Sequence, residues 1–195
     1  MQNPLDFTGQ VVIVTGRCLS TMPVAHRLPK LPPCPPRFSE SILRLNLMAP
    51  LNLSQFANRV MQQQSQGGCI INICIISARR PSPGTAACGA AKAGLVNLTQ
   101  SLAEEWAPKV RMNSVIAGMI QTDQSHLHYG DEEGIARVAR TVPLQRLAQP
   151  SDIDDTCLYL ASDLASYVSS AEVVVHGGGE KPAFLEVATA DNATL

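Results

Sequence analysis

The sequence predicts an α/β fold: a parallel sheet covered by helices on both faces. Two short apolar runs, at 10–16 and 69–75, are rich in β-branched residues and typical of strands buried inside a parallel sheet. A helical pattern at 88–107 follows the second run after a short turn. Between the two strands, however, the proline-rich segment 17–37 is expected to form neither a regular helix nor a central strand.

The first strand is predicted from four consecutive β-branched residues, Val11 to Val14, which are followed by Thr15 and Gly16. The segment 17–37 then contains Pro23, Pro29, Pro32, Pro33, Pro35 and Pro36. Since proline donates no backbone hydrogen bond, neither a regular helix nor a central strand is expected there. We interpret the segment as a linker or as the remnant of a deletion.

Helical spacing resumes at Phe38 and continues to Met61, and Pro50 predicts a kink within this long helix. The strand at 69–75 and a loop beginning at Pro81 lead into the helix carrying Leu95, Leu98, Leu102 and Trp106. Together, the strand, loop and helix form one α/β unit.

The C-terminal part continues the alternation of strands and helices. A further strand is expected at 110–118 and a helix at 150–162. Between them, the polar segment 124–141 is expected to cover the substrate site, with His126 and His128 on a mobile loop. The last strand, from Glu172, ends in Gly177 to Gly179. We therefore expect one domain, 1–179, and a loose tail at 180–195.

These segments resemble the short-chain dehydrogenase/reductase family, whose fold is a doubly wound, Rossmann-like parallel sheet. The resemblance implies that the sheet is incomplete here, because the segment 17–37 replaces part of the N-terminal, cofactor-binding half. In that family an Asn-Ile-Ser-Ser strand end is followed by a Tyr-x-x-x-Lys motif on the next helix. Asn72-Ile73 and Lys92 match, but Ile75 stands at the serine position and Cys88 at the tyrosine position. By resemblance, Lys92 would lower the tyrosine pKa and bind the nicotinamide ribose, and Asn46 would hold a water of the proton relay.

The resemblance implies NAD or NADP as the cofactor. Thr15 and Gly16 match the start of the family's glycine-rich phosphate loop, whereas Ser20 and Met22 occupy later glycine positions. Side chains therefore stand where the pyrophosphate needs close backbone approach. Nor does any Asp or Glu occur between Asp6 and Glu40 to accept the ribose hydroxyls.

Two later positions also match the family's cofactor contacts. Gly118 ends an Asn-x-Val-x-x-Gly segment, with Ala117 where the family has proline. Thr122 matches the residue that contacts the nicotinamide carboxamide or a cofactor phosphate.

The substitutions predict that carbonyl reduction is nearly abolished. Ile75 has no donor, and removal of such a donor costs about 10²–10³ in rate. The thiol of Cys88 is too short to replace a phenol as general acid, which is worth roughly 10²–10⁴. Cys88 has two interpretations: a thiolate activated by its helix start and by Lys92, or a small residue that fills the space of the tyrosine. Ser77 is a candidate substitute hydroxyl, two residues beyond the strand-end position.

Composition excludes several function classes. The formal charge is −1 and no dense Lys/Arg run occurs, so neither nucleic acid nor anionic lipid is an expected partner. The six cysteines have no zinc-type spacing, so no metal site is expected, and Cys69, Cys74 and Cys157 are predicted to be buried hydrophobes. With neither a signal peptide nor a long apolar stretch, the chain is expected to be cytoplasmic.

Three functions remain open. The chain is an NAD(P)-dependent oxidoreductase by descent, inactivated by its substitutions; or a non-catalytic partner that pairs with itself or an intact relative; or a truncated product without selected activity. The helices at 39–62 and 88–107 resemble those with which the family forms oligomers. Loss of the strand that normally separates the first strand from 69–75 should leave a gap or force these two strands to pair.

Overall fold

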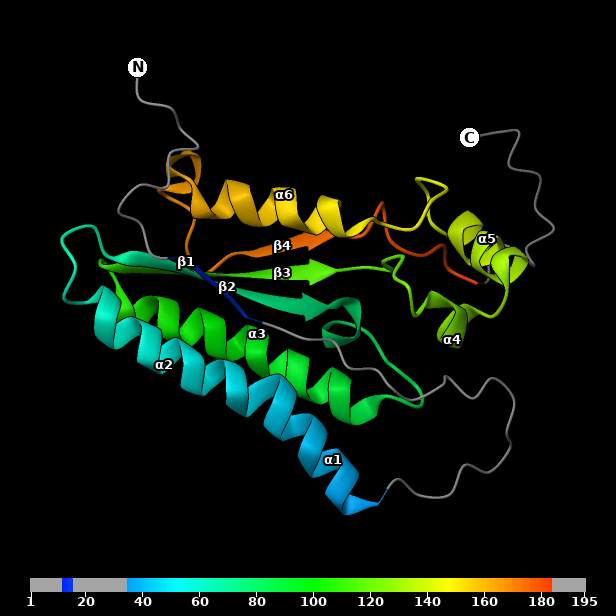
Figure 1. The fold of residues 1–195 in the computed structure, drawn as a ribbon, viewed down its shortest axis with the longest axis horizontal. Helices are drawn as coiled ribbons and strands as arrows, with labels where there is room; N and C mark the ends of the chain where they lie inside the picture. The colour runs from blue at the N-terminus through cyan, green and yellow to red at the C-terminus, as the bar shows by residue number, and fades with distance from the viewer. Residues whose placement is uncertain (1–11, 16–34, 184–195) are drawn as a thin grey trace.

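A computed structural model of the chain describes residues 12–15 and 35–183. Its core is a four-stranded sheet in the order β1 (Val12–Thr15), β2 (Gly68–Ile75), β3 (Val110–Ala117) and β4 (Glu172–Val175). Every neighbouring pair is parallel. Helices α2 and α3 cover one face and α6 covers the other (Figure 1). This is the predicted α/β class, an incomplete doubly wound parallel sheet.

Strands β1 and β2 pair directly, so the sheet has closed over the missing strand. Their register runs from Val12 opposite Cys69 to Thr15 opposite Asn72. Of the two outcomes expected from the sequence, a gap or a forced pair, the structure shows the pair. Val14 on this edge strand is 53% exposed, because α6 makes its main contacts with β2 and β3 rather than with β1.

The long N-terminal helical region is interrupted, as Pro50 predicted. It comprises α1 (Pro36–Leu43), a π-helical turn (Arg44–Met48) and α2 (Ala49–Met61). Pro50 has no N–H for the carbonyl of Asn46, four residues earlier. The N–H of Ala49 instead reaches the carbonyl of Arg44, five residues back, which is the π-type bond.

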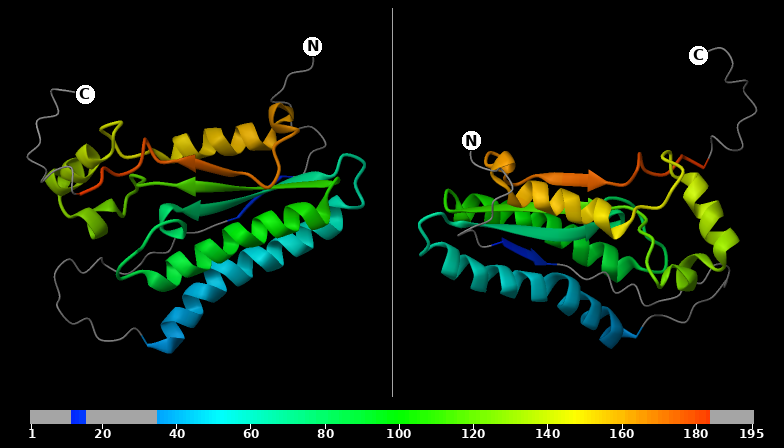
Figure 2. Two further views of the ribbon diagram at one scale, coloured as in Figure 1. Left: turned by 180° about the vertical axis from the view of Figure 1, so that it is seen from behind. Right: turned by 45° about the horizontal axis from the view of Figure 1, so that its top comes forward.

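Helix α3 (Ala86–Trp106) lies beside α1 and α2 in one layer (Figure 2). Beneath α2 and α3, the sheet contributes Ile70, Met112, Cys74 and Ile116 to the core; all four are fully buried. On the opposite face, Ile153 and Leu160 of α6 (Pro150–Ala161) pack on the other side chains of β2 and β3. Alternate side chains of each strand thus bury on opposite faces, as in a parallel sheet wound on both sides.

Beyond the carboxyl end of β3 lie two short helices, α4 (Ser125–Tyr129) and α5 (Glu132–Thr141) (Figure 1). The expectation of a loop around His126 and His128 was wrong, because both residues belong to α4. The α5 helix starts at Asp131, whose carboxylate accepts the N–H of Gly134 at 2.8 Å. This N-cap explains why a polar segment forms a helix here.

Helix α6 starts as predicted, with Pro150 in its first turn and Asp152 as an acidic partner. The Asp152 carboxylate accepts the backbone N–H of Gln149 at 2.7 Å and both terminal nitrogens of Arg146, at 2.6 and 2.9 Å. Among the described residues, no helix is long and apolar enough to span a bilayer. The predicted linker 17–37 and tail 180–195 lie mostly outside the described residues.

Candidate functional site

The candidate site lies at the carboxyl edge of the sheet, where parallel strands deliver their terminal residues to one place. Strand β2 ends at Ile75 and is followed by a 3-10 turn, Ile76–Ala78. Strand β3 ends beside Gly118, and β4 leads into His176. The edge therefore gathers positions that are far apart in the sequence.

Lys92 is buried, with 1% of its surface exposed, on the sheet-facing side of α3. Its ammonium donates a hydrogen bond to the carbonyl oxygen of Ile73 at 2.7 Å. An ammonium held by a strand carbonyl under α3 is a structural contact. The lysine that matches the family motif thus points at the protein's own backbone.

Cys88 and Ile75 occupy the acid and donor positions that the resemblance implied. Cys88 lies in the first turn of α3, one turn before Lys92, and is only 4% exposed. Ile75 is half-buried at the end of β2. Neither side chain offers a phenol or a hydroxyl, so the pair cannot donate a proton and a hydrogen bond to a carbonyl oxygen as Tyr and Ser do.

Asn46 is buried in the π-helical turn that packs against α3. Its side-chain nitrogen donates to the carbonyl of Ile42 at 3.1 Å, while its Oδ1 has no protein partner. The sequence predicted an irregular helix here and, as one interpretation, an Asn46 side chain that hydrogen-bonds to backbone groups near the kink. The hydrogen bond to the Ile42 carbonyl is such a contact.

The first strand places Thr15 inside the sheet layer. Its hydroxyl is buried and donates to the side-chain oxygen of Asn72 on β2. Asn72 in turn donates to the hydroxyl of Thr99 on α3 at 2.8 Å. Gly16, the other predicted cofactor residue of this strand, lies outside the described residues.

Gly118 and Thr122 follow β3. A Cβ on Gly118 would lie 2.7 Å from the Cβ of His176, so glycine is required where the β3 and β4 ends approach each other. The backbone N–H of Thr122 donates to the hydroxyl of Ser125 at 2.8 Å, and its own Oγ1 accepts the N–H of Gln124 at 3.3 Å. Thr122 therefore shapes the entry into α4.

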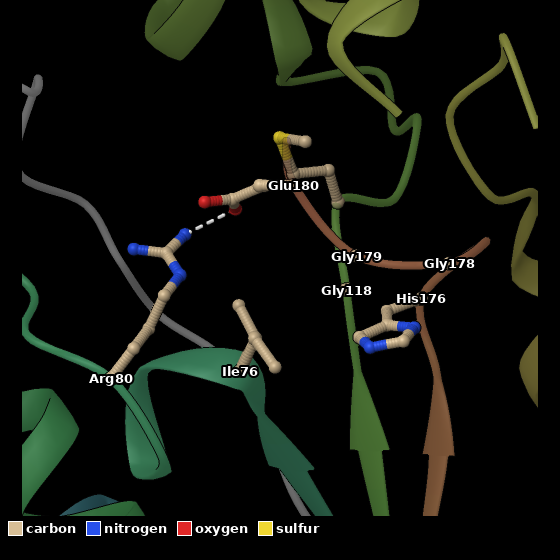
Figure 3. Close-up of a pocket in the computed structure, with 8 residues that line it drawn as sticks. Ile76, Arg80, Gly118, His176, Gly178, Gly179 and Glu180 are labelled. Atoms are coloured by element: carbon tan, nitrogen blue, oxygen red, sulfur yellow. Dashed lines mark hydrogen bonds and ion pairs between the residues drawn. The ribbon is translucent and has the colours of Figure 1, made fainter. Parts of the chain in front are cut away.

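A pocket of about 320 Å³ opens at the carboxyl ends of β2, β3 and β4 (Figure 3). It is lined by Ile76, Arg80, Gly118, Met119, His176 and the segment 178–180. Arg80, from the turn after β2, forms an ion pair with Glu180, which follows β4. Of these residues, only Gly118 was predicted from the sequence, although the strand ends and the glycine run 177–179 were visible signals.

A second, smaller pocket of about 120 Å³ adjoins the first, and His176 and Met119 line both. Its other walls include Val142, Leu144 and Val175, so its interior is largely apolar. Gly178, with φ of +97°, packs where a Cβ would lie 2.9 Å from Pro143. The left-handed glycines let the chain after β4 turn closely around both pockets.

Burial governs the thiols near the site. Desolvation raises the pKa of Cys74 to about 11, and the nearby Lys92 charge only partly opposes it. Burial likewise raises the pKa of Cys157 on α6 to about 11. Among the described residues, no group of three or more His, Cys, Asp or Glu side chains could hold a metal ion.

Comparisons with known proteins agree with this architecture. The family model described as enoyl-(acyl carrier protein) reductase matches residues 34–180. The chain belongs to the short-chain dehydrogenase/reductase family. The matched range includes both α3, which carries Lys92, and α6.

Three similar proteins illustrate the relationship. Protein FixR of Bradyrhizobium diazoefficiens is 34% identical over 139 residues, which are 70% of this chain and 48% of that protein. L-rhamnose 1-dehydrogenase (NAD(P)(+)) of Azotobacter vinelandii is 39% identical over 125 residues, 64% of this chain and 49% of that protein. The structure of 7α-hydroxysteroid dehydrogenase complexed with NADH and 7-oxo glycochenodeoxycholic acid matches with a TM-score of 0.70 and 28% identity, over 77% of this chain and 58% of that one.

The chain spans about half the length of the curated relatives it matches. The match to the family model begins at residue 34, after the proline-rich segment. The matched region therefore contains every described helix and strand except β1.

Proposed function

We propose that this chain is a non-catalytic member of its family. The face formed by the π-helical turn and α2 pairs with a second copy of the same chain. The observation that carries the proposal is a stripe of exposed apolar side chains along this face. It comprises Leu45, Met48, Leu53, Phe56 and Val60, which are between 38% and 64% exposed. Solvent-exposed apolar stripes of this kind are typical of surfaces that bind another protein.

The stripe follows the helical spacing of one face of the π-helical turn and α2. Phe56 and Val60 lie one turn apart, and Arg59 stacks over the Phe56 ring with its guanidinium carbon 5.4 Å from the ring centroid. Beside it in the same layer, the outer face of α3 exposes the small residues Ala86, Ala90 and Ala93. A row of bulky apolar side chains beside a row of alanines suits an isologous, two-fold pairing. In such a pairing the bulky row of each copy covers the alanine face of α3 in the other copy.

The absence of catalysis is supported by the site itself. Ile75 and Cys88 offer neither of the two hydrogen-bonding groups of the family's active site, and Lys92 is engaged with the Ile73 carbonyl. The direct β1–β2 pairing further brings the start of the phosphate loop one strand closer to β2. Since neighbouring strands lie about 4.8 Å apart, the two halves of a dinucleotide site would be displaced relative to each other by about that distance.

Sedimentation velocity at several protein concentrations tests the pairing. The wild-type chain should sediment as a dimer, and Phe56→Asp should sediment as a monomer, because the variant replaces apolar contact area with a carboxylate that must lose its water at the centre of the contact. Leu164→Asp is the matched control, since Leu164 is 60% exposed on the opposite side of the sheet and should leave the dimer intact. A wild-type chain that stays monomeric at tens of micromolar would overturn the proposal.

Co-purification with a full-length family member separates the two pairing modes. The proposal expects homodimers to persist when an intact relative is co-expressed. Formation of mixed dimers that are lost in Phe56→Asp would instead assign the same face to a heteromeric role. Aggregation of the wild-type chain without a cooperative melt would indicate a truncated product with no selected role.

The competing function is hydride transfer with NAD or NADP, which is favoured by the retained Lys92 and Asn46. Thermal melts with and without millimolar NADH or NADPH address it. A ligand at 100 times its dissociation constant stabilises by about 2.7 kcal/mol, which shifts the melting temperature by several degrees. We expect no shift with either cofactor, and a shift with one of them would reopen the enzyme assignment.

A further inference from the structure

We propose that the pocket at the ends of β2, β3 and β4 binds a small organic carboxylate, with Arg80 as the group that holds it. This inference goes beyond the pairing function and does not depend on it. It rests on three features of the pocket: its charged groups, its apolar wall and its size (Figure 3).

The charged groups that line the pocket are Arg80, His176 and Glu180. Glu180 is the sole acid among them, and its carboxylate already lies against the Arg80 guanidinium. The protein's own carboxylate therefore shows that the guanidinium can receive a carboxylate from the pocket side. Arg80 also donates to the carbonyl of Pro81 at 3.2 Å, which helps to orient the guanidinium.

The ion pair is weak enough to be exchanged. The Arg80 and Glu180 side chains are 41% and 37% exposed, and ion pairs in solvent contribute only about 0–1 kcal/mol. A ligand carboxylate can replace Glu180 and use the forked donors of the guanidinium.

Once Glu180 has been displaced, the remaining ionisable groups in the pocket lining are Arg80 and His176. Both can donate hydrogen bonds to an anion, since even a neutral imidazole carries one N–H. The side chains of Ile76 and Met119 supply apolar wall for a short carbon skeleton. The volume of about 320 Å³ is at the small end for ligand sites, so the ligand is a small molecule.

The test uses butanoate as the probe and butanamide as its neutral control, titrated by NMR into the full chain. Butanoate should perturb the resonances of His176 and Met119, and butanamide should bind at least tenfold more weakly. Arg80→Met should weaken butanoate binding by at least tenfold. Arg79→Met is the matched control, because Arg79 pairs with Glu172 outside the pocket lining and should leave binding unchanged.

Glu180→Gln should change the affinity for butanoate in the opposite direction to Arg80→Met. Removal of the internal competitor should strengthen butanoate binding by up to about fivefold, because the wild-type site is partly occupied by Glu180. Equal binding of butanoate and butanamide, unchanged binding in Arg80→Met, or weaker binding in Glu180→Gln would each overturn the proposal. Equal binding of butanoate to Arg79→Met and Arg80→Met at saturating concentration would likewise identify nonspecific binding.

Discussion

The hydroxyl of Thr15 on β1 donates a hydrogen bond to the side-chain oxygen of Asn72 on β2, inside the α3 side of the sheet. The amide of Asn72 continues the chain to Thr99, and the Thr99 hydroxyl donates to the carbonyl of Leu95 at 2.7 Å. All three side chains are buried. These hydrogen bonds join β1 to β2 and to α3.

Asn72→Leu should lower the free energy of unfolding by about 1–3 kcal/mol, because it leaves the buried Thr15 hydroxyl without an acceptor. Urea unfolding at neutral pH measures this change. Gln124→Leu, at an exposed position before α4 and away from α3, is the control and should stay within about 0.5 kcal/mol of wild type. A further cycle with Thr15→Val should show coupling of at least about 0.5 kcal/mol between positions 15 and 72. Strict additivity would mean that β1 does not pair with β2 in solution.

Much of the fold could be predicted from local pattern. The run 69–75 is apolar and β-branched because β2 is covered on both faces, and that burial leaves a direct signature in the sequence. The interruption of the helix near Pro50 was likewise predicted, since the missing N–H of a proline has a local consequence, whereas its form as a π-helical turn required the structure. Conversely, helix α4 at His126 was missed because a short polar helix has no apolar periodicity to reveal it.

Long-range relationships were harder to predict. Nothing in residues 12–15 specifies which strand they join, so pairing and an open gap were equally compatible with the sequence. The same applies to Arg80 and Glu180, which are a hundred residues apart in the chain and meet only because two strand ends are neighbours in space. The motif positions Lys92, Cys88 and Ile75 were found from sequence, but the contact of Lys92 with the Ile73 carbonyl required the structure.

The Arg146–Asp152 pair predicts a specific acid dependence of stability. Hydrogen bonds from Arg146, followed by the backbone N–H of Gln149, lower the pKa of Asp152 from 3.8 to about 2. A lowered folded-state pKa gives stability that is fully present above the unfolded value of 3.8, and that is lost as pH falls from about 4 toward 2. Asp152→Asn should therefore flatten the stability profile in that window. Asp155→Asn, on the same helix, should retain the wild-type slope when both are compared by urea unfolding between pH 5.5 and 3.

Cysteine labelling distinguishes the two interpretations of Cys88. Cys74 and Cys88 are almost completely buried, so iodoacetamide at pH 8 should modify them only as fast as the protein unfolds. Cys157 is half-buried with a pKa raised from 9.0 to about 11, so its labelling should be about a hundredfold slower than in the urea-unfolded chain and should accelerate about tenfold per pH unit. Peptide mass mapping of native and unfolded samples gives all three rates. If Cys88 in the folded chain reacts at pH 7 faster than it does in urea, then it is an activated thiolate, and the interpretation as inert packing in the place of the tyrosine is wrong.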